Sequence, residues 1–576
     1  KVAEMVLWIG YLQWHFRTYG HSNPPEPVLR DFHNIENRDA LIEYDSRSQQ
    51  LDANGRPVTI WDGLTLKTSP VTGELIPDDS ARIPVYQYHN PKPADWPQAD
   101  YIVGNPPFIG ASTMRRALGD GYVDAVRSVF KGTVPESADF VMFWWHIAAD
   151  KVRLGEGKTG APQQFGFITT NSLRQTFNRR VLEPHLNDPK KPLSLAFAIP
   201  DHPWVDAADG AAVRIAMTVG VAGERQGRLL TSLKESETQT DEIRVDFQNR
   251  EGKLFADLKI GADVGSSSPL SSNVAMAIKG FELGNQGFLI EREQALNLLG
   301  EKDSLSSVLK PYSNGIQLVS GVQPFYVFDL HGLTIDKVLS SYPEAYQWVL
   351  SRVKDERVVN RETRTSAKWW LFRRSGEQLR KATLGLTRFI ATVRTAKHRV
   401  FQFVPGNLVA ESKIVVLASS DFAVLGVTSS RLHVLWSFAT GGWLGVGNDP
   451  TYNHTDCFET FPFPELTDAQ QSRIGLLAEQ IDQHRKRQQA AHDSLTLTGI
   501  YNVLEKLRKQ EPLNDKDKVI YHDGLVGILR ELHDDLDRAV FEAYGWQDLA
   551  DKLVGLPGAT TPFPEKSEAQ AEAEEE

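Results

Sequence analysis

The chain has 576 residues, of which 41% are hydrophobic and 24% charged, with a formal net charge of -11. This length predicts several domains of ~100–200 residues each. No apolar run approaches the ~18 residues of a membrane-spanning helix, so we expect a soluble protein with the cytoplasm as its default location. The single cysteine, Cys457, excludes an intramolecular disulfide framework and a multi-cysteine metal site, and we expect no metal.

The first predicted element is a mostly apolar helix over residues 2–14, which begins directly after Lys1 and has no capping residue before it. We therefore expect the sequence to be truncated, with an upstream segment missing. Residues 33–42 predict a strand that carries Asp39 near its end, and a polar, turn-rich insertion follows over 45–95.

The stretch 99–108 predicts a buried strand that stops abruptly in a rigid turn. Residues 101–103 form an apolar, β-prone run, and two prolines cannot continue a sheet ladder. Asn105 is therefore expected at the carboxyl end of the strand, where open α/β sheets bind ligands. The Asn105 side-chain oxygen and the Pro106 carbonyl can accept hydrogen bonds from one planar amino group, while Phe108 can stack on its ring. These parts suit the exocyclic amine of a base.

This Asn-Pro-Pro-Phe sequence resembles the catalytic motif of amino-directed DNA methyltransferases, chiefly those that act on adenine N6. The resemblance implies a class I, Rossmann-like, doubly wound α/β domain, S-adenosylmethionine as methyl donor, and catalytic roles for Asn105, Pro106, Pro107 and Phe108. Two acceptors that grip the amino group favour a pyramidal, more nucleophilic nitrogen. The target adenine must leave the helix to reach them. A turn that only ends a strand is the alternative.

The resemblance also implies donor-binding residues. An acidic residue one strand before the motif contacts the adenine amino group of the donor, which places this role on Asp39. Capping of the following turn is the alternative role for Asp39. The start of the helix predicted over 137–149, at Asp139 and Phe140, matches a family position near the donor.

Three more strands are predicted over 164–171, 193–199 and 212–219, which complete a catalytic domain over residues 1–225. In similar enzymes the loop between the last two strands carries a side chain that packs on the flipped base. Trp204 is the candidate here, with a Trp that plugs the domain edge as the alternative.

Residues 226–299 are polar and loop-rich and predict a connector, and the composition changes over 300–465. Within 351–400 there are 14 Lys and Arg against 4 Asp and Glu. These cations alternate with aromatic residues at Trp369, Trp370, Phe372 and Phe389. Cations bind phosphates, and arginine and planar rings contact base edges or faces, so this composition is typical of a nucleic-acid surface. The first arginines to test are Arg361, Arg364, Arg373 and Arg374.

The end of this segment, residues 448–464, resembles the closing stretch of target-recognition domains in large single-chain, type IIL-like adenine methyltransferases. Charged helical periodicity over 466–555 predicts a helical extension, and the acidic tail over 556–576 is expected to be disordered. A glycine-rich turn after a first strand and an acidic residue for the donor ribose are not found. We therefore expect weak donor binding by this chain alone.

These patterns together indicate a site-specific adenine-N6 DNA methyltransferase from a restriction-modification or phage-defence system. The expected partner is double-stranded DNA, with an upstream segment or a cognate nuclease as a further partner. Two alternatives stay open: a DNA-recognition subunit or pseudoenzyme that does not bind the donor, and an amide-directed methyltransferase, against which the basic 351–400 segment argues.

Overall fold

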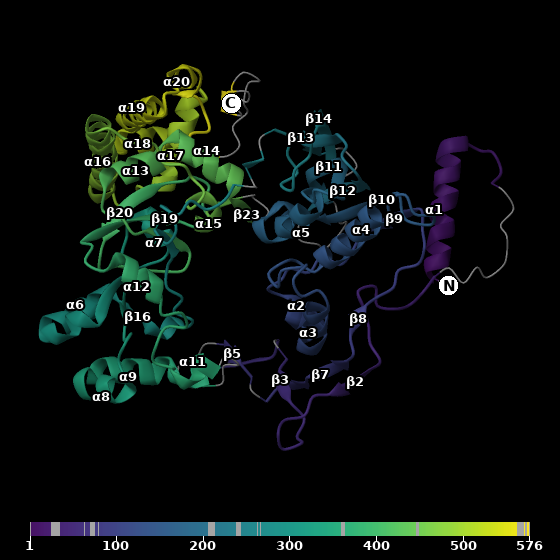
Figure 1. Cartoon of the computed structure of the whole chain (residues 1–576). Helices are drawn as coiled ribbons and strands as arrows, with labels where there is room; N and C mark the ends of the chain where they lie inside the picture. Colours follow the sequence, from purple (N-terminus) through teal and green to yellow (C-terminus); the bar gives the residue numbers. More distant parts are fainter. Residues whose placement is uncertain are drawn as a thin grey trace.

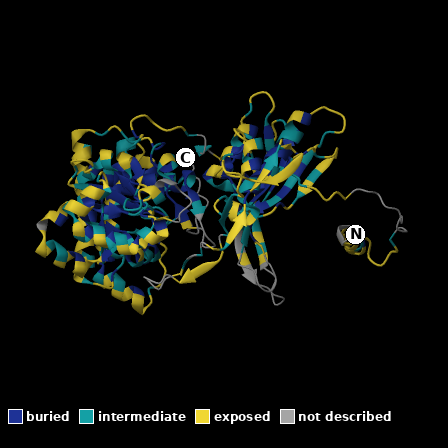
Figure 2. Cartoon of the chain, turned by 90° about the horizontal axis from the view of Figure 1, so that it is seen from below, coloured by how far each residue is buried: buried dark blue, intermediate teal, exposed yellow. Residues whose placement is uncertain are grey.

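The computed structural model describes residues 2–24, 35–62, 64–68, 75–78, 80–204, 213–237, 243–261, 263–264, 267–358, 363–444, 449–561, 570 and 573–574. Two bodies lie side by side, one built from residues up to 261 and the other from residues 270 onward (Figure 1). Figure 2 shows the buried residues gathered inside each body. No helix in the described residues is long and apolar enough to cross a membrane.

A six-stranded mixed sheet forms the first body, in the order β14-β13-β11-β12-β10-β9. Neighbours β9 and β10 are parallel, and β12 is antiparallel to both β10 and β11. The strands are β9 (Tyr101–Gly104), β10 (Gln164–Thr170), β11 (Leu193–Trp204), β12 (Val213–Ala222), β13 (Gly227–Glu237) and β14 (Ile243–Gly252). The expected α/β domain is confirmed, because a helical crossover joins the parallel pair as in a βαβ unit.

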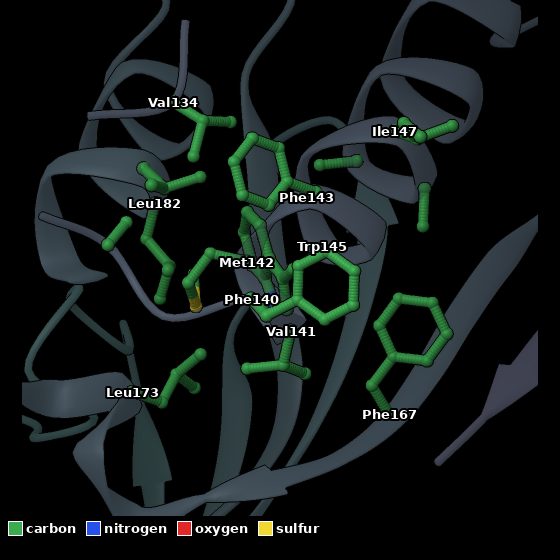
Figure 3. Packing of buried hydrophobic residues seen from close by; sticks show 14 of the residues in the cluster. Val134, Phe140, Val141, Met142, Phe143, Trp145, Ile147, Phe167, Leu173 and Leu182 are labelled. Carbon is green, nitrogen blue, oxygen red and sulfur yellow. The ribbon is translucent and has the colours of Figure 1, made fainter. Parts of the chain in front are cut away.

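The core of this body packs between the sheet and the helix α4 (Val141–Gly155). Aromatic side chains from Phe140 to Trp145 fill this space (Figure 3). Along β10 burial alternates, with Phe165 and Phe167 on the buried face. The helix α5 (Thr176–Leu186) follows β10 after a short turn, η1 (Asn171–Arg174), and adds Val181 to the same core.

The strand before the Asn-Pro-Pro-Phe motif lies at the edge of the sheet, so the expectation of a buried strand is wrong. Tyr101 is 55% exposed and Val103 85% exposed. Among the described strands only β10 pairs with β9. A short apolar run has the same local pattern in a central strand and in an edge strand, and therefore does not predict which of the two it forms.

The N-terminal segment contains the predicted helix, but the strand predicted after it is shorter than expected. The helix α1 (Val2–Tyr19) confirms the predicted apolar helix, and most of its described apolar residues are exposed. The strand predicted over 33–42 is wrong in extent where the structure describes it, from residue 35 on: β1 covers Ile42–Glu43 and pairs with β8 (Lys92–Pro93), while 33–34 lie outside the described residues. In its described residues the insertion forms three short antiparallel pairs: β2 (Ser46–Gln49) with β7 (Tyr86–His89), β3 (Thr59–Trp61) with β6 (Arg82–Pro84), and β4 (Leu66–Thr68) with β5 (Leu75–Pro77). Two further helices, α2 (Met114–Leu118) and α3 (Asp120–Val129), follow the motif.

The connector expected over 226–299 is corrected at both ends. Strands β13 and β14 belong to the first sheet, because β13 pairs in parallel with β11. The second body already includes Leu270 and Asn273, which donate to the Glu459 carbonyl and to the Phe458 and Phe461 carbonyls, and its first strand is β15 (Ala277–Lys279), whose side chains enter its core. The polar composition of this segment predicted loops, because the solvent-exposed faces of its strands carry many charged residues.

Two four-stranded sheets, β15-β22-β19-β20 and β16-β18-β17-β21, organise the second body. Their strands are β16 (Leu289–Glu291), β17 (Leu309–Ser313), β18 (Phe325–Phe328), β19 (Arg388–Val393), β20 (Phe401–Pro405), β21 (Val409–Ala410) and β22 (Ile414–Leu417). The helices around them are α6 (Arg292–Glu301), α7 (Gly315–Ser320), α8 (Ile335–Ser341), α9 (Pro343–Arg352), α10 (Lys354–Val358), α11 (Thr363–Ala367) and α12 (Glu377–Thr383).

The C-terminal part confirms the predicted helical character of residues 466–555. Before it come α13 (Phe422–Ser429), α14 (Arg431–Thr440), β23 (Gly442–Leu444), β24 (Asp449–Thr451) and α15 (His454–Cys457). The extension contains α16 (Asp468–Ala491), α17 (Leu497–Arg508), α18 (Asp515–Asp523), α19 (Val526–Tyr544) and α20 (Gln547–Leu553). Helices α13, α16 and α19 contact one another and join the extension to the rest of the second body.

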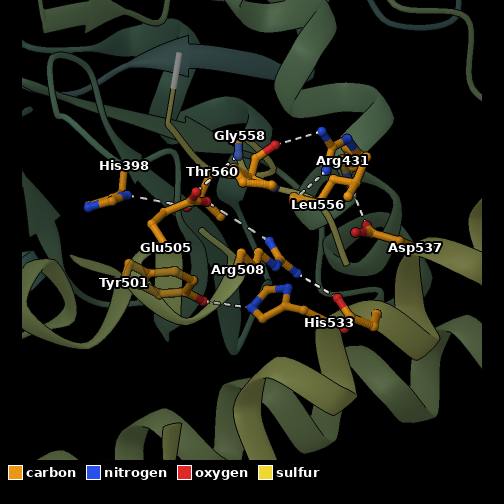
Figure 4. A network of polar contacts seen from close by, with 12 residues as sticks. His398, Arg431, Tyr501, Glu505, Arg508, His533, Asp537, Leu556, Gly558 and Thr560 are labelled. Atoms are coloured by element: carbon orange, nitrogen blue, oxygen red, sulfur yellow. Dashed lines mark hydrogen bonds and ion pairs between the residues drawn. The ribbon is translucent and has the colours of Figure 1, made fainter. Parts of the chain in front are cut away.

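A buried polar network fixes this helical part (Figure 4). The Asp537 carboxylate accepts a hydrogen bond from the Arg431 main-chain N–H at 2.7 Å and so caps the start of α14. Glu505 accepts from the Gly558 N–H at 2.9 Å. The expectation of a disordered tail over 556–576 is wrong for its described residues, since Glu574 pairs with buried Arg431 at 2.8 Å and Ala573 is buried.

Candidate functional site

The Asn-Pro-Pro-Phe turn follows the carboxyl end of β9, and its first residue is exposed to solvent. Asn105 is exposed, Pro106 is buried and Phe108 is half-buried. Among the described residues the Asn105 side chain makes no hydrogen bond, so its amide oxygen is available to a ligand. The Ile109 N–H donates to the Pro107 carbonyl at 3.1 Å, which tightens the turn.

Asp139 holds the loop that follows this turn. Its Oδ1 accepts from the Ala111 N–H at 3.1 Å, and its Oδ2 accepts from the Ser172 hydroxyl at 2.6 Å and from the Asn178 amide at 2.9 Å. The next residue, Phe140, donates its N–H to the Ile109 carbonyl at 2.9 Å. The predicted donor-binding pair Asp139 and Phe140 is therefore next to the catalytic turn, where it braces the loop.

Tyr122 joins this assembly to Asp39. The Tyr122 hydroxyl, on α3, donates to Asp39 Oδ2 at 2.6 Å, and its ring meets the Phe140 ring edge-on with centroids 6.3 Å apart. Burial, reinforced by the Asp39 carboxylate, raises the pKa of Tyr122 well above its ordinary value, so the phenol stays a donor. The structure thus brings Asp39, Phe140 and the loop after Asn105 together, although they are 35 to 101 residues apart.

Asp39 also caps a turn, which was the alternative role. Its Oδ1 accepts from the Leu41 N–H at 2.8 Å and from the Ile42 N–H at 3.1 Å. Each carboxylate oxygen has two lone pairs, so Oδ2 keeps one acceptor position beyond the bond from Tyr122. Capping and contact with an exocyclic amine are therefore compatible in this geometry.

The described residues fit the adenine end of the expected donor. Asp39 Oδ2 offers the acceptor that an adenine amino group needs, and Tyr122 is hydrogen-bonded to it. The Phe140 ring packs against the Tyr122 ring and is buried, so it presents little surface. No group of three or more His, Cys, Asp or Glu side chains in the described part of the chain is arranged to hold a metal ion.

Trp204 is the last residue of β11, so the expected loop from 201 is strand up to this position. The loop that follows, 205–212, lies outside the described residues. Trp204 is partly exposed and pairs with Val213 across the hairpin. Three residues before it, both carboxylate oxygens of Asp201 accept from the Arg214 Nε–H at 2.8 Å, and Oδ1 also accepts from the Asn171 amide at 3.0 Å. Sequence reasoning did not predict this charged cluster, nor Tyr122 or Asn178.

The second body contacts the first at the start of α5. The Thr176 hydroxyl donates to Asp456 Oδ2 at 2.7 Å, and Arg179 donates to the Thr440 carbonyl at 3.0 Å. Gln175 donates to the Trp443 carbonyl at 2.5 Å. These contacts lie just after β10, the neighbour of the catalytic strand.

The four arginines proposed to contact DNA differ in how much of each the structure describes. Arg361 lies outside the described residues, and only the backbone of Arg364 is described, in α11. Arg373 and Arg374 share the Glu282 carboxylate, at 2.8 and 3.2 Å, and both side chains are exposed.

Fewer cations of the basic 351–400 segment are exposed than its composition indicated. Arg357 and Arg399 are buried and donate to main-chain carbonyls, including that of Leu371 for Arg357 at 3.0 Å. Phe372 and Phe389 are core residues, and the two tryptophans pack against the same cluster. Several members of the expected nucleic-acid footprint therefore stabilise the fold.

Comparison with known proteins gives a consistent assignment. Two family models match this chain: "MmeI, DNA-methyltransferase domain" over residues 2–232 and "MmeI, target recognition domain" over residues 264–465. Together they span about three quarters of the chain. A "DNA methyltransferase A" of Bacillus subtilis (strain 168) is 21% identical over 391 residues, which are 66% of this chain and 41% of that protein.

Solved structures agree at the level of the fold. The structure of the Type IIL restriction-modification enzyme MmeI in complex with DNA matches with a TM-score of 0.58 and 19% identity, over 77% of this chain and 54% of that one. The type IIG restriction endonuclease BpuSI covers the same shares at 12% identity, but its TM-score of 0.24 is too low to indicate a shared arrangement. The chain spans about half the length of these relatives. Two matching family models and one shared fold lead to the same conclusion: the chain belongs to the MmeI family of DNA methyltransferases with a target recognition domain.

Proposed function

We propose that this chain carries the catalytic turn and the target recognition domain of a site-specific DNA methyltransferase, which transfers a methyl group to adenine N6. The observation that carries the proposal is the convergence at the end of β9. An exposed Asn105 stands before a loop that Asp139 and Phe140 hold, and Tyr122 connects them to Asp39. S-adenosylmethionine, when bound, supplies an electrophilic methyl group.

The turn can bind an amino group from one side. Asn105 Oδ1 and the Pro106 carbonyl accept its two N–H bonds, and this pair of acceptors favours a pyramidal nitrogen whose lone pair is free to attack. Proline contributes a carbonyl but no competing N–H. Phe108 is half-buried and retains surface on which a base can stack.

The target adenine must turn out of the duplex, because the turn cannot reach an amino group inside a base-pair stack. Trp204 ends β11 at the same end of the sheet as the carboxyl end of β9, and it is partly exposed. It is the proposed contact for the extruded base. Residues 300–465 would select the DNA sequence, with Arg373 and Arg374 as the described exposed cations to test first. A restriction-modification or phage-defence system is the proposed context.

The direct test is product analysis. The complete product of the gene that encodes this chain is incubated with duplex DNA and methyl-labelled S-adenosylmethionine, and the DNA is digested to nucleosides for mass spectrometry. Labelled N6-methyladenine at one sequence context is expected. Labelled N4-methylcytosine would overturn the choice of adenine, and label on protein glutamine would favour the amide-directed alternative. Specific DNA binding without any transfer at saturating donor would identify a recognition subunit.

A further inference from the structure

We infer that Asn178 is a positioning residue through which contact with the target recognition domain fixes the loop that carries Asn105. The inference rests on the proposed function for the consequence it has in catalysis. Its structural content is separate: one turn of α5 holds the catalytic loop on one side and the recognition domain on the other.

Asn178 uses its whole side-chain amide inside the catalytic domain. Its Oδ1 accepts from the Asp139 N–H at 2.9 Å, and its Nδ2 donates to Asp139 Oδ2 at 2.9 Å and to the Ser172 carbonyl at 2.8 Å. The residue is 3% exposed. Removing the Asn178 amide therefore leaves the Asp139 main-chain N–H without its partner, whereas the Ser172 carbonyl keeps the bond from the Gln175 N–H and Asp139 Oδ2 keeps the bond from the Ser172 hydroxyl. An unpartnered N–H costs more than one exchanged hydrogen bond.

Asp139 connects Asn178 to the catalytic loop through hydrogen bonds. Residues 105–111 form no helix or strand, and Pro106 and Pro107 have no N–H with which to anchor the loop. The bond from the Ala111 N–H to Asp139 Oδ1 and the bond from the Phe140 N–H to the Ile109 carbonyl tie the loop to residues 139–140. A loop with so few backbone bonds opens easily when one of its supports is lost.

The same turn of α5 contacts the recognition domain through different residues. Thr176 donates to Asp456, and Arg179 donates to the Thr440 carbonyl. Thr176 and Arg179 are three positions apart and share one face of the helix, whereas Asn178 is two positions from Thr176 and lies on another face. Arg179 is buried, so its bond to the Thr440 carbonyl holds this turn of α5 against the recognition domain. Docking of the recognition domain thus sets the position of Asn178.

The first test measures loop order without requiring activity. Hydrogen exchange is followed by mass spectrometry in the complete gene product. In Asn178→Ala, peptides over 105–113 should exchange about tenfold faster, the effect of losing ~1.4 kcal/mol of local stability, while β12 peptides should not change. Asp456→Ala alters only the recognition side and should raise exchange of the same loop. Asn187→Ala removes an exposed amide from the other end of α5 and is the matched control.

The second test measures catalysis. Asn178→Ala should lower kcat about tenfold and leave the KM for DNA within twofold, because the loop and not the DNA surface is affected. Asn178→Asp should be worse, since it places two carboxylates together. Adding Asp139→Asn to Asn178→Asp removes this repulsion and should restore part of kcat. Melting temperatures of the same variants separate this recovery of kcat from a recovery of folding.

Each outcome decides the inference. Unchanged loop exchange in Asn178→Ala would overturn it, whatever the activity. A loop effect in Asn178→Ala with none in Asp456→Ala would overturn the link to the recognition domain. If Asn178→Ala does not fold, the same test is made with Asp456→Ala and with the double variant that combines Asn178→Asp and Asp139→Asn. Faster loop exchange in an enzyme that makes no methyladenine would support the positioning role and refute the proposed function.

Discussion

Asn105→Ala is expected to abolish most methyl transfer while leaving the fold intact. The Asn105 side chain is exposed and makes no hydrogen bond to the described residues, so its loss should change the free energy of unfolding by no more than about 0.5 kcal/mol. In catalysis it supplies one of two preorganised acceptors. Loss of one such group typically lowers kcat by about 10²–10³, or ~2.7–4 kcal/mol of transition-state stabilisation.

The assay is single-turnover methyl transfer at saturating DNA and donor, with thermal unfolding and DNA binding measured on the same samples. Specific DNA binding should persist, because the acceptor contacts the amino group and not the phosphates. Asn105→Asp keeps an acceptor oxygen at the same position and should lose less activity than Asn105→Ala. Activity of the Ala variant within tenfold of wild type would refute the role of Asn105, and a matching fall in melting temperature would attribute the loss to the fold.

Three further changes test separate parts of the molecule. Phe108→Ala should lower transfer less than Asn105→Ala, because base stacking contributes ~1–3 kcal/mol; single-turnover rates compare the two. Arg374→Ala should weaken binding to all DNA sequences and lower the salt slope by about 1, since its side chain is 76% exposed and we expect it to neutralise one phosphate; fluorescence titration at several salt concentrations measures this. Burial raises the pKa of Asp537 from 3.8 to about 6, so the stability this carboxyl contributes is present at low pH and lost as pH rises through 6. Asp537→Asn stays neutral and keeps the acceptor for Arg431, so its advantage in urea unfolding should grow by up to ~1.4 kcal/mol per pH unit between those values; an advantage that shrinks as pH rises would contradict this.

The chemistry of the site was predictable where it depends on neighbours in the sequence. An apolar run followed by two prolines predicts where a strand must end, and Asn105 does stand at the end of β9. Helical periodicity likewise predicted α4 and the long helices of the C-terminal part. The same local pattern did not predict that β9 is an edge strand, because edge and central strands differ in their partners and not in their own residues.

Long-range side-chain contacts were not predictable. Tyr122 and Asn178 are ordinary polar residues on helices, and only the fold places them against Asp39 and Asp139. Composition also misled in the basic segment, since it counts cations without showing where they point. Arg357 is buried and donates to main-chain carbonyls, a role that has no signature in sequence.

The contacts at α5 bear on how far recognition and catalysis can be separated. If residues 300–465 choose the sequence and residues 1–225 choose the atom, exchange of 300–465 with that of a relative should change the methylated site and still yield methyladenine. Two of the contacts that hold α5 are made to the carbonyls of Thr440 and Trp443, which any sequence provides. The contact to Asp456 depends on its side chain. We therefore expect exchanged proteins that keep an acidic residue at 456 to retain kcat, and those that lose it to bind the new site but methylate it slowly. An unchanged site after the exchange would refute the division of labour, and equal rates with and without the acid would show that the main-chain contacts suffice.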